Sequence, residues 1–149
     1  MIVVTGGANG VGAAVVERFV SSGIEVLLLD RTRSARTSTE VTFAEVDVTD
    51  DVAVREAIDF GRGDATLEAL VCSAGIFDIE PAPTSAAFRH VIDINLVGTW
   101  NAMQACEPWF GSQASVVTVA SVSGRTRSAF AGPAYVASKA GVIGLTRAM

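Results

Sequence analysis

One pair of residues near the end of the chain has the types and spacing needed to move a proton. Tyr135 and Lys139 are the single tyrosine and the single lysine among 149 residues, whereas arginine is used elsewhere. A phenol carries protons poorly at neutral pH unless its anion is stabilised. Residues four apart share one face of a helix, so the Lys139 ammonium would stabilise a Tyr135 phenolate as a compact point charge, a role that suits arginine poorly.

The segments that must position this pair alternate between short apolar runs and longer stretches of helical period. We expect strands at 2–5, 25–30, 41–47, 69–75 and 115–121, and helices at 11–22, 50–60, 84–107 and from 133 onward. Continuous Val, Leu and Ile runs are typical of strands that are covered on both faces. The alternation predicts an α/β fold, a Rossmann-like doubly wound parallel sheet with helices on both faces, as one domain over 1–149. The polar segment 31–40 predicts a short or missing crossover helix.

A glycine-rich turn, TGGANGVG (5–12), follows the first expected strand and opens the first helix. Glycine permits positive φ and lets backbone amides approach a phosphate, although such a turn alone serves equally well as a tight connection. Asp30 ends the next strand, where a carboxylate would accept hydrogen bonds from an adenosine ribose and repel a 2′-phosphate. The sequence therefore favours NAD, while Arg31 and Arg33 beside Asp30 keep NADP as the alternative.

These motifs resemble those of the short-chain dehydrogenase/reductase family, whose phosphate turn reads TGxxxGxG and whose active site contains YxxxK. Further motifs occur in the family's order: DVTD (47–50) resembles its adenine-binding motif, INLVGT (94–99) its asparagine motif and ASVSG (120–124) its catalytic-serine motif. One motif departs from the pattern, because CSAG (72–75) stands where the family usually has NNAG. The resemblance extends from the first strand to the last residue.

The resemblance implies an oxidoreductase that moves a hydride between a nicotinamide cofactor and a small-molecule alcohol or carbonyl substrate. In such an enzyme Tyr135 would exchange the proton on the substrate oxygen, and Lys139 would also bind the nicotinamide ribose. Ser121 is expected at the end of the fifth strand, where it would orient the substrate oxygen, with Ser123 as the alternative. Asn95 is expected to distort its helix so that its backbone carbonyl holds a water against Lys139.

The resemblance also assigns the expected cofactor contacts. Asp47 would accept a hydrogen bond from the adenine amino group, the Val48 amide would contact the ring, and Ala74 and Gly75 would let the backbone pass close to the cofactor. The full expected set is Thr5, Gly6, Asn9, Gly10, Val11, Gly12, Asp30, Arg31, Asp47, Val48, Ser73, Ala74, Gly75, Tyr135 and Lys139.

Composition argues against other classes of partner. The formal net charge of -5 provides no basic face for nucleic acid. No apolar run approaches the roughly 20 residues that cross a bilayer, and no signal peptide opens the chain, so we expect a cytoplasmic protein without a membrane partner. Cys72 and Cys106 match no metal-binding spacing, and His90 has no neighbouring ligands in sequence. We therefore expect buried reduced thiols, a histidine on a helix surface and no metal.

Family members continue beyond the last residue of this chain, through two further strands and a loop that covers the substrate. The strand expected at 115–121 would then be an uncovered apolar edge. Two functions stay open: the oxidoreductase described above, and a truncated, non-catalytic dinucleotide-binding or oligomerisation fragment of such an enzyme. The family forms dimers through helices equivalent to 84–107 and 133–149, so a homo-oligomer is expected. The apolar segments 74–81 and 128–135 hint at a partly hydrophobic substrate.

Overall fold

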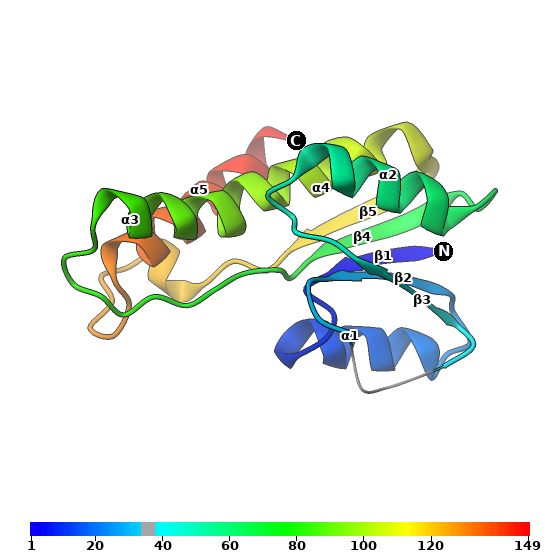
Figure 1. Ribbon diagram of the computed structural model, residues 1–149, viewed down its shortest axis with the longest axis horizontal. Helices are drawn as coiled ribbons and strands as arrows, with labels where there is room; N and C mark the ends of the chain where they lie inside the picture. The colour runs from blue at the N-terminus through cyan, green and yellow to red at the C-terminus, as the bar shows by residue number, and fades with distance from the viewer. Residues whose placement is uncertain (34–37) are drawn as a thin grey trace.

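A parallel sheet lies between two layers of helices in the computed structural model, which describes residues 1–33 and 38–149 (Figure 1). The strands of the described chain are β1 (Ile2–Thr5), β2 (Val26–Asp30), β3 (Val41–Glu45), β4 (Leu67–Cys72) and β5 (Phe110–Thr118). Their order is β3-β2-β1-β4-β5, and neighbouring strands are parallel. The predicted Rossmann-like parallel sheet is confirmed.

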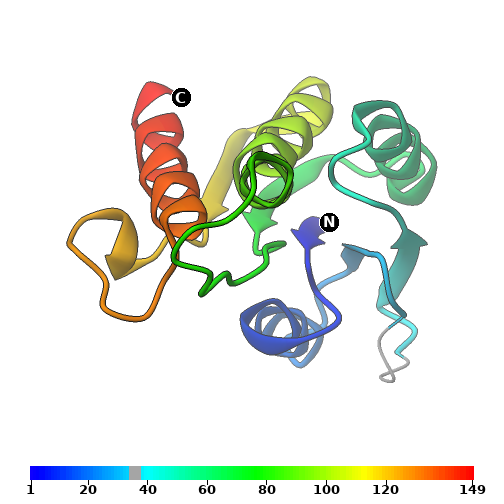
Figure 2. The same ribbon diagram turned by 60° about the vertical axis from the view of Figure 1, so that its left-hand side comes forward.

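Helices cover both faces of this sheet, as the doubly wound prediction requires. Figure 2 shows α1 (Gly10–Val20) on one face and α2 (Asp51–Arg62), α4 (Gly98–Cys106) and α5 (Pro133–Ala148) on the other. Because β1 has β2 on one side and β4 on the other, the strand order reverses at β1. Ligands of doubly wound sheets bind at the carboxyl ends of the strands at such a point.

Each face of the sheet contributes its own apolar core. On one face Val16 of α1 packs with Val4 and Leu28, while on the other Ile58 of α2 packs with Val3. Successive strand residues point to opposite faces, so a strand buried on both sides needs the continuous apolar run seen in β1 and β2. The apolar runs of the sequence thus account for the central strands.

The long helix expected at 84–107 is interrupted. The structure contains α3 (Ser85–Ile92), a π-helical segment at Asp93–Val97, then α4, and the N–H of Gly98 donates to the carbonyl of Asp93, five residues back. A π segment inserts one extra residue into a helix. The interruption contains Asn95, in the motif that the family resemblance assigned to a helix distortion.

Three predicted strands have different bounds in the structure. β3 ends at Glu45 instead of 47, β4 runs from Leu67 to Cys72 instead of 69–75, and β5 runs from Phe110 to Thr118 instead of 115–121. The polar start of β5 pairs with β4 through a register irregularity, so polarity at 111–114 does not mark a loop. The chain leaves the sheet early because strand pairing, rather than apolar composition, determines where β4 and β5 end.

Other expectations concern single segments and residues. Residues 34–37 lie outside the described chain, and no helix occurs at 31–33 or 38–40, which agrees with the predicted gap in the alternation. Cys72 and Cys106 are buried and reduced, and burial raises the pKa of the Cys72 thiol to about 12. His90 is exposed on α3. Within 1–33 and 38–149, no helix combines the length and hydrophobicity needed to span a membrane.

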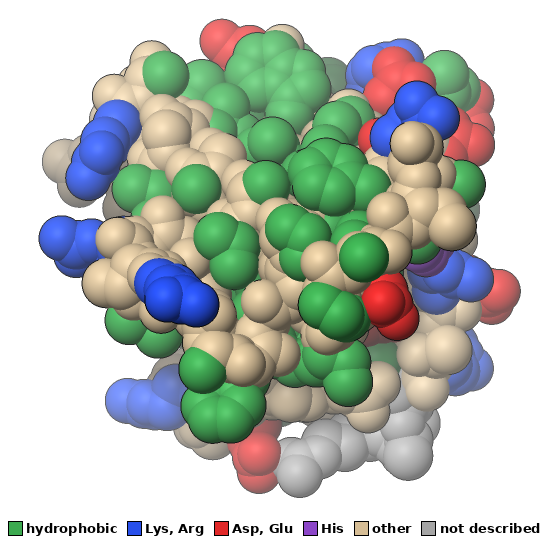
Figure 3. All heavy atoms as spheres, turned by 90° about the vertical axis from the view of Figure 1, so that its left-hand side faces the viewer, with side chains coloured by type: hydrophobic (Ala, Val, Ile, Leu, Met, Phe, Trp, Pro, Cys, Tyr) green, Lys and Arg blue, Asp and Glu red, His purple; other side chains and the backbone are tan. Residues whose placement is uncertain are grey.

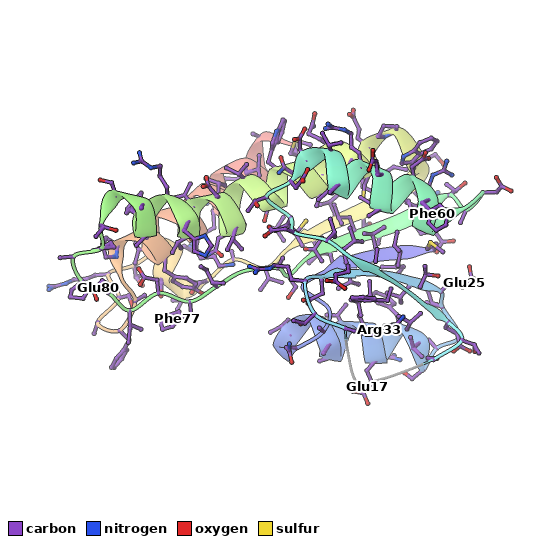
Figure 4. All side chains as sticks on the ribbon, viewed as in Figure 1. Glu17, Glu25, Arg33, Phe60, Phe77 and Glu80 are labelled. Atoms are coloured by element: carbon purple, nitrogen blue, oxygen red, sulfur yellow. The ribbon has the colours of Figure 1, made fainter. Side chains whose placement is uncertain are left out.

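Two positions on α2 test the packing of this face. Ile58 has none of its surface exposed, while Phe60 is 92% exposed on the same helix (Figure 4). We expect Ile58→Ala to lower the free energy of unfolding by about 2–5 kcal/mol, because it removes buried methyl groups and leaves a cavity. Phe60→Ala should change it by less than about 0.5 kcal/mol. Urea unfolding of both variants measures the difference, and equal losses would contradict the assigned faces.

Candidate active site

A cavity of about 450 Å³ opens at the carboxyl ends of the strands, at the reversal point beside β1. All the expected cofactor contacts line it except Thr5 and Gly12. Tyr135 and Lys139 line it as well, so the glycine-rich turn and the tyrosine–lysine pair border the same space although they lie more than a hundred residues apart in sequence.

The glycine-rich turn has the backbone that its residue types predict. Gly6 has a φ of +68°, and a Cβ placed on it would lie 2.5 Å from the Cα of Ala74, so no larger residue fits. A Cβ on Gly12 would overlap the carbonyl oxygen of Gly6. Thr5 also holds the Ala74 segment close to the glycine-rich turn, because its hydroxyl accepts a hydrogen bond from the N–H of Ala74 at 3.2 Å. Thr5 and Gly12 therefore shape the cavity from behind its lining.

The start of α1 faces this cavity without a capping side chain. Asn9 occupies the N-cap position and makes no side-chain capping hydrogen bond, and Asn9, Gly10 and Val11 all line the cavity. The first N–H groups of a helix lack partners within the helix and carry partial positive charge. These N–H groups fit an anionic phosphate group.

Asp30 and Asp47 form the acidic part of the cavity wall. One Asp30 oxygen accepts a hydrogen bond from the N–H of Ala8 in the glycine turn at 2.9 Å, and the other accepts from the N–H of Thr32 at 3.1 Å. Hydrogen bonding from the N–H of Thr49 holds the pKa of the Asp47 carboxyl below its usual value, and the charge of Arg31 adds to this effect. The Arg31 Nε lies 3.7 Å from the Asp47 carboxylate.

The Lys139 ammonium lies in the cavity wall between the Val119 carbonyl and the Tyr135 ring. Its ammonium donates a hydrogen bond to the carbonyl of Val119, just beyond β5, at 2.7 Å and lies 5.8 Å from the centre of the Tyr135 ring. Only 6% of the residue is exposed, and burial lowers the pKa of Lys139. A Cβ on Gly75 would lie 3.5 Å from the Lys139 Nζ. The absence of a side chain at Gly75 therefore leaves space in front of the ammonium.

Asn95 is completely buried behind the lining and joins three segments of the chain. Its side-chain oxygen accepts a hydrogen bond from the N–H of Ile76 at 2.8 Å. Its amide nitrogen donates to the carbonyl of Ile76 and to the hydroxyl of Ser138, each at 3.0 Å. The Asn95 carbonyl accepts from the hydroxyl of Thr99 at 2.9 Å. The side chain therefore fixes the position of neighbouring segments.

Ser121 differs most from its predicted position. β5 ends at Thr118, so Ser121 lies three residues beyond the strand and caps the short 3-10 helix Val122–Gly124. Its hydroxyl accepts a hydrogen bond from the N–H of Ser123 at 3.2 Å. The cavity lining includes the adjacent Val119 and Ala120 but neither serine. The structure therefore brings Tyr135 and Lys139 together at the cavity and leaves Ser121 and Asn95 outside its lining.

Sequence reasoning missed several residues of this site. Ser138 links Asn95 to α5, because its hydroxyl also donates to the carbonyl of Tyr135 at 2.8 Å. Ile76 and Phe77 line the cavity directly after the CSAG motif. Their position after β4 was a usable signal, and so was the small polar residue Ser138 directly before Lys139 on the same helix. In the described ranges, no three His, Cys, Asp or Glu side chains form a metal-binding group.

The single lysine allows its titration to be observed without overlap. Because burial penalises the charged ammonium, NMR of lysine-labelled protein should give a midpoint below the ordinary 10.5. The unfolded chain keeps the ordinary pKa and binds more protons between the two values, so the free energy of unfolding should rise with pH across that window. In Lys139→Met this rise should be weaker. A midpoint at or above 10.5 in the folded protein would contradict the burial argument.

Known proteins share both the sequence pattern and this architecture. The family described as "short chain dehydrogenase" matches residues 1–149. Human 3-hydroxyacyl-CoA dehydrogenase type-2 is 32% identical over 97% of this chain and 64% of its own length. The NAD(+)-linked 2-dehydro-3-deoxy-L-rhamnonate dehydrogenase of a Sphingomonas strain is 35% identical over 99% of this chain and 63% of its own length.

A solved structure extends the comparison to three dimensions. Ligand-free Thermoplasma acidophilum aldohexose dehydrogenase superposes with a TM-score of 0.89 at 31% identity, covering 99% of this chain and 59% of that protein. The chain thus spans less than two thirds of the length of each of these three relatives. Because the family match covers every residue and agrees with the sheet order and the glycine turn, the chain belongs to the short-chain dehydrogenase family.

Proposed function

We propose that this chain forms the cofactor-binding and proton-transfer part of an NAD-dependent oxidoreductase that interconverts alcohols and carbonyl compounds. The cavity carries this proposal, because its lining includes both the uncapped start of α1 and the Tyr135–Lys139 pair. The relatives named above are all dehydrogenases, which supports the same class of reaction.

The residues present fit a dinucleotide. The N–H groups at the start of α1 would bind the pyrophosphate, and Asp30, at the end of β2, would accept hydrogen bonds from the adenosine ribose. Asp47 and Val48 would contact the adenine, while Ser73, Ala74 and Gly75 would lie along the cofactor at the end of β4. The bacterial relative named for NAD(+) supports NAD, as does the Asp30 charge, which opposes a 2′-phosphate.

The chain's own residues would then manage the proton. When bound, the nicotinamide group supplies the hydride acceptor or donor. Tyr135 removes the hydroxyl proton of an alcohol, or gives a proton to a carbonyl oxygen in the reverse direction. Lys139, fixed by the carbonyl of Val119, stabilises the phenolate and presents N–H groups to the nicotinamide ribose. Asn95 holds the backbone that carries the tyrosine through Ser138, and its carbonyl would hold the relay water.

The position of Ser121 bears on the second candidate function, a dinucleotide-binding fragment without turnover. We infer that the Ser121 hydroxyl orients the substrate oxygen, with Ser123 as the alternative. This hydroxyl accepts a hydrogen bond within the 3-10 helix, and the same oxygen can still donate its O–H to a substrate. The observation that favours the second candidate function is the position of both serines outside the cavity lining. Cofactor titration combined with a panel of alcohols separates the oxidoreductase from the dinucleotide-binding fragment.

We also propose a homo-oligomer through 84–107 and 133–149, where Trp100 exposes 41% of its surface.

Removal of one hydroxyl tests the proton-transfer assignment. We expect Tyr135→Phe to lower turnover by roughly 10²–10⁴-fold, because the general acid/base is lost, while NADH binding stays within about twofold. Turnover is measured by NADH absorbance and binding by NADH fluorescence. Wild-type turnover in the variant would refute the role of Tyr135. NADH binding by the wild type without oxidation of any alcohol in the panel would favour the non-catalytic fragment.

The Asp30 charge should set the preference between cofactors. In the wild type we expect NADH to bind more tightly than NADPH. Asp30→Asn keeps an oxygen that can accept the hydrogen bonds of Ala8 or Thr32 but removes the charge, so NADPH affinity should rise by about tenfold. Parallel fluorescence titrations with the two cofactors measure the change, and Asp59→Asn, far along α2 from the cavity, is the matched control. An unchanged preference in Asp30→Asn would contradict this role.

A further inference from the structure

The cavity wall beside Tyr135 is built from an aromatic ring that remains open to solvent. Phe77 lines the cavity, and its ring meets the Tyr135 ring edge-on, with centroids 4.8 Å apart and planes at 73°. Phe77 nevertheless exposes 60% of its surface. The Phe77 ring thus stabilises the Tyr135 ring through this edge-on contact, while much of the Phe77 ring itself is exposed and can contact a ligand.

Two more apolar side chains extend this wall outward. Ile79 is 70% exposed and Phe130 is 82% exposed, and they come from segments that are hydrogen-bonded to each other, because the N–H of Gly132 donates to the carbonyl of Asp78 at 2.7 Å. Figure 3 shows hydrophobic side chains gathered at this end of the molecule. We call Phe77, Ile79 and Phe130 the apolar rim.

The polar side chains of Asp78 and Ser128, beside the apolar rim, contact the backbone of their own segments. The Asp78 carboxylate accepts a hydrogen bond from the N–H of Glu80 at 2.9 Å, while its other oxygen is buried beside Gly132 and has no hydrogen-bond partner among the described residues. The hydroxyl of Ser128 accepts from the N–H groups of Phe130 and Ala131. The rim therefore presents its apolar side chains outward and turns these polar groups toward its own backbone.

The backbone that carries Phe77 is fixed rather than free to fold away. Asn95 accepts a hydrogen bond from the N–H of Ile76 and donates one to its carbonyl, one residue before Phe77. Figure 4 shows Phe77 on the loop that runs from β4 toward α3. An exposed aromatic ring on a hydrogen-bonded backbone is preorganised for contact with an apolar ligand, because the chain loses little conformational entropy when the ligand binds.

We propose that the substrate carries an apolar ring or alkyl group next to its reacting carbon, and that Phe77 is the residue that selects it. This inference rests on the proposed function, since it places the substrate oxygen at Tyr135. An apolar group beside that oxygen packs against Phe77 and extends toward Ile79 and Phe130. A polyhydroxylated group in the same position loses water without gaining hydrogen bonds from the rim, so the site discriminates against it.

Tyr135 itself reports on this site, because it is the single tyrosine of the chain. NMR of protein with labelled tyrosine gives the signals of this ring alone, and Phe77→Ala should shift them by removing the edge-on ring. Cyclohexanol and inositol are matched probes, since inositol is the same ring with a hydroxyl on every carbon. Each is titrated into the full chain with and without saturating NAD, and NADH fluorescence is recorded on the same samples.

We expect cyclohexanol to shift the Tyr135 signals at concentrations where inositol does not. Phe77→Ala should weaken cyclohexanol binding roughly tenfold, Phe77→Leu should retain most of it, and the distant control Phe60→Ala should leave it unchanged. An inositol response equal to that of cyclohexanol, no response to either alcohol, or an unaltered affinity in Phe77→Ala would overturn the inference, while NADH binding would still support the cofactor-binding part of the proposed function. Absence of NADH binding would overturn both.

Discussion

The buried amide of Asn95 is the constraint on which the geometry of the site depends. It binds both backbone groups of Ile76 and the hydroxyl of Ser138, and thereby joins the segment after β4, the π-helical segment and α5. Ser138 passes the restraint on to the carbonyl of Tyr135. A buried amide that lost these partners would cost roughly 1–3 kcal/mol for each unsatisfied group. The two rings that meet at the cavity, Phe77 and Tyr135, are therefore placed by one side chain.

The π-helical segment allows the two halves of the interrupted helix to face different neighbours. α3 packs against α5, whereas α4 packs against α2 and the sheet through Met103 and Cys106. An α-helix turns about 100° per residue, so one inserted residue offsets the two apolar stripes by about that angle. In a continuous α-helix, a single apolar face would have to pack against both α5 and α2. The distortion at Asn95 is thus a packing requirement as well as a feature of the site.

How far the sequence predicts this structure depends on whether a feature is local. The glycine turn and the facing of Tyr135 and Lys139 follow from spacing, since each is determined within a few residues. The parallel sheet follows from the alternation of apolar runs with helical stretches along the whole chain. The position of Ser121 does not, because the end of β5 depends on pairing with β4 and its register irregularity. The contact of Phe77 with Tyr135 does not follow either, because it joins residues 58 positions apart, and the apolar segment 74–81 hinted only at a partly hydrophobic substrate.

The residues around Lys139 give a steric reason why this position is a lysine in a chain whose other basic side chains are arginines. A Cβ on Gly124 would lie 2.6 Å from the Lys139 backbone, and one on Gly75 would lie 3.5 Å from its Nζ, so glycines pack around both ends of the residue. The ammonium reaches the Val119 carbonyl in this narrow space. A planar guanidinium is broader, carries more N–H groups and is always charged, so more of its donors would be buried without partners. The small residues and the compact cation are therefore two parts of one packing solution.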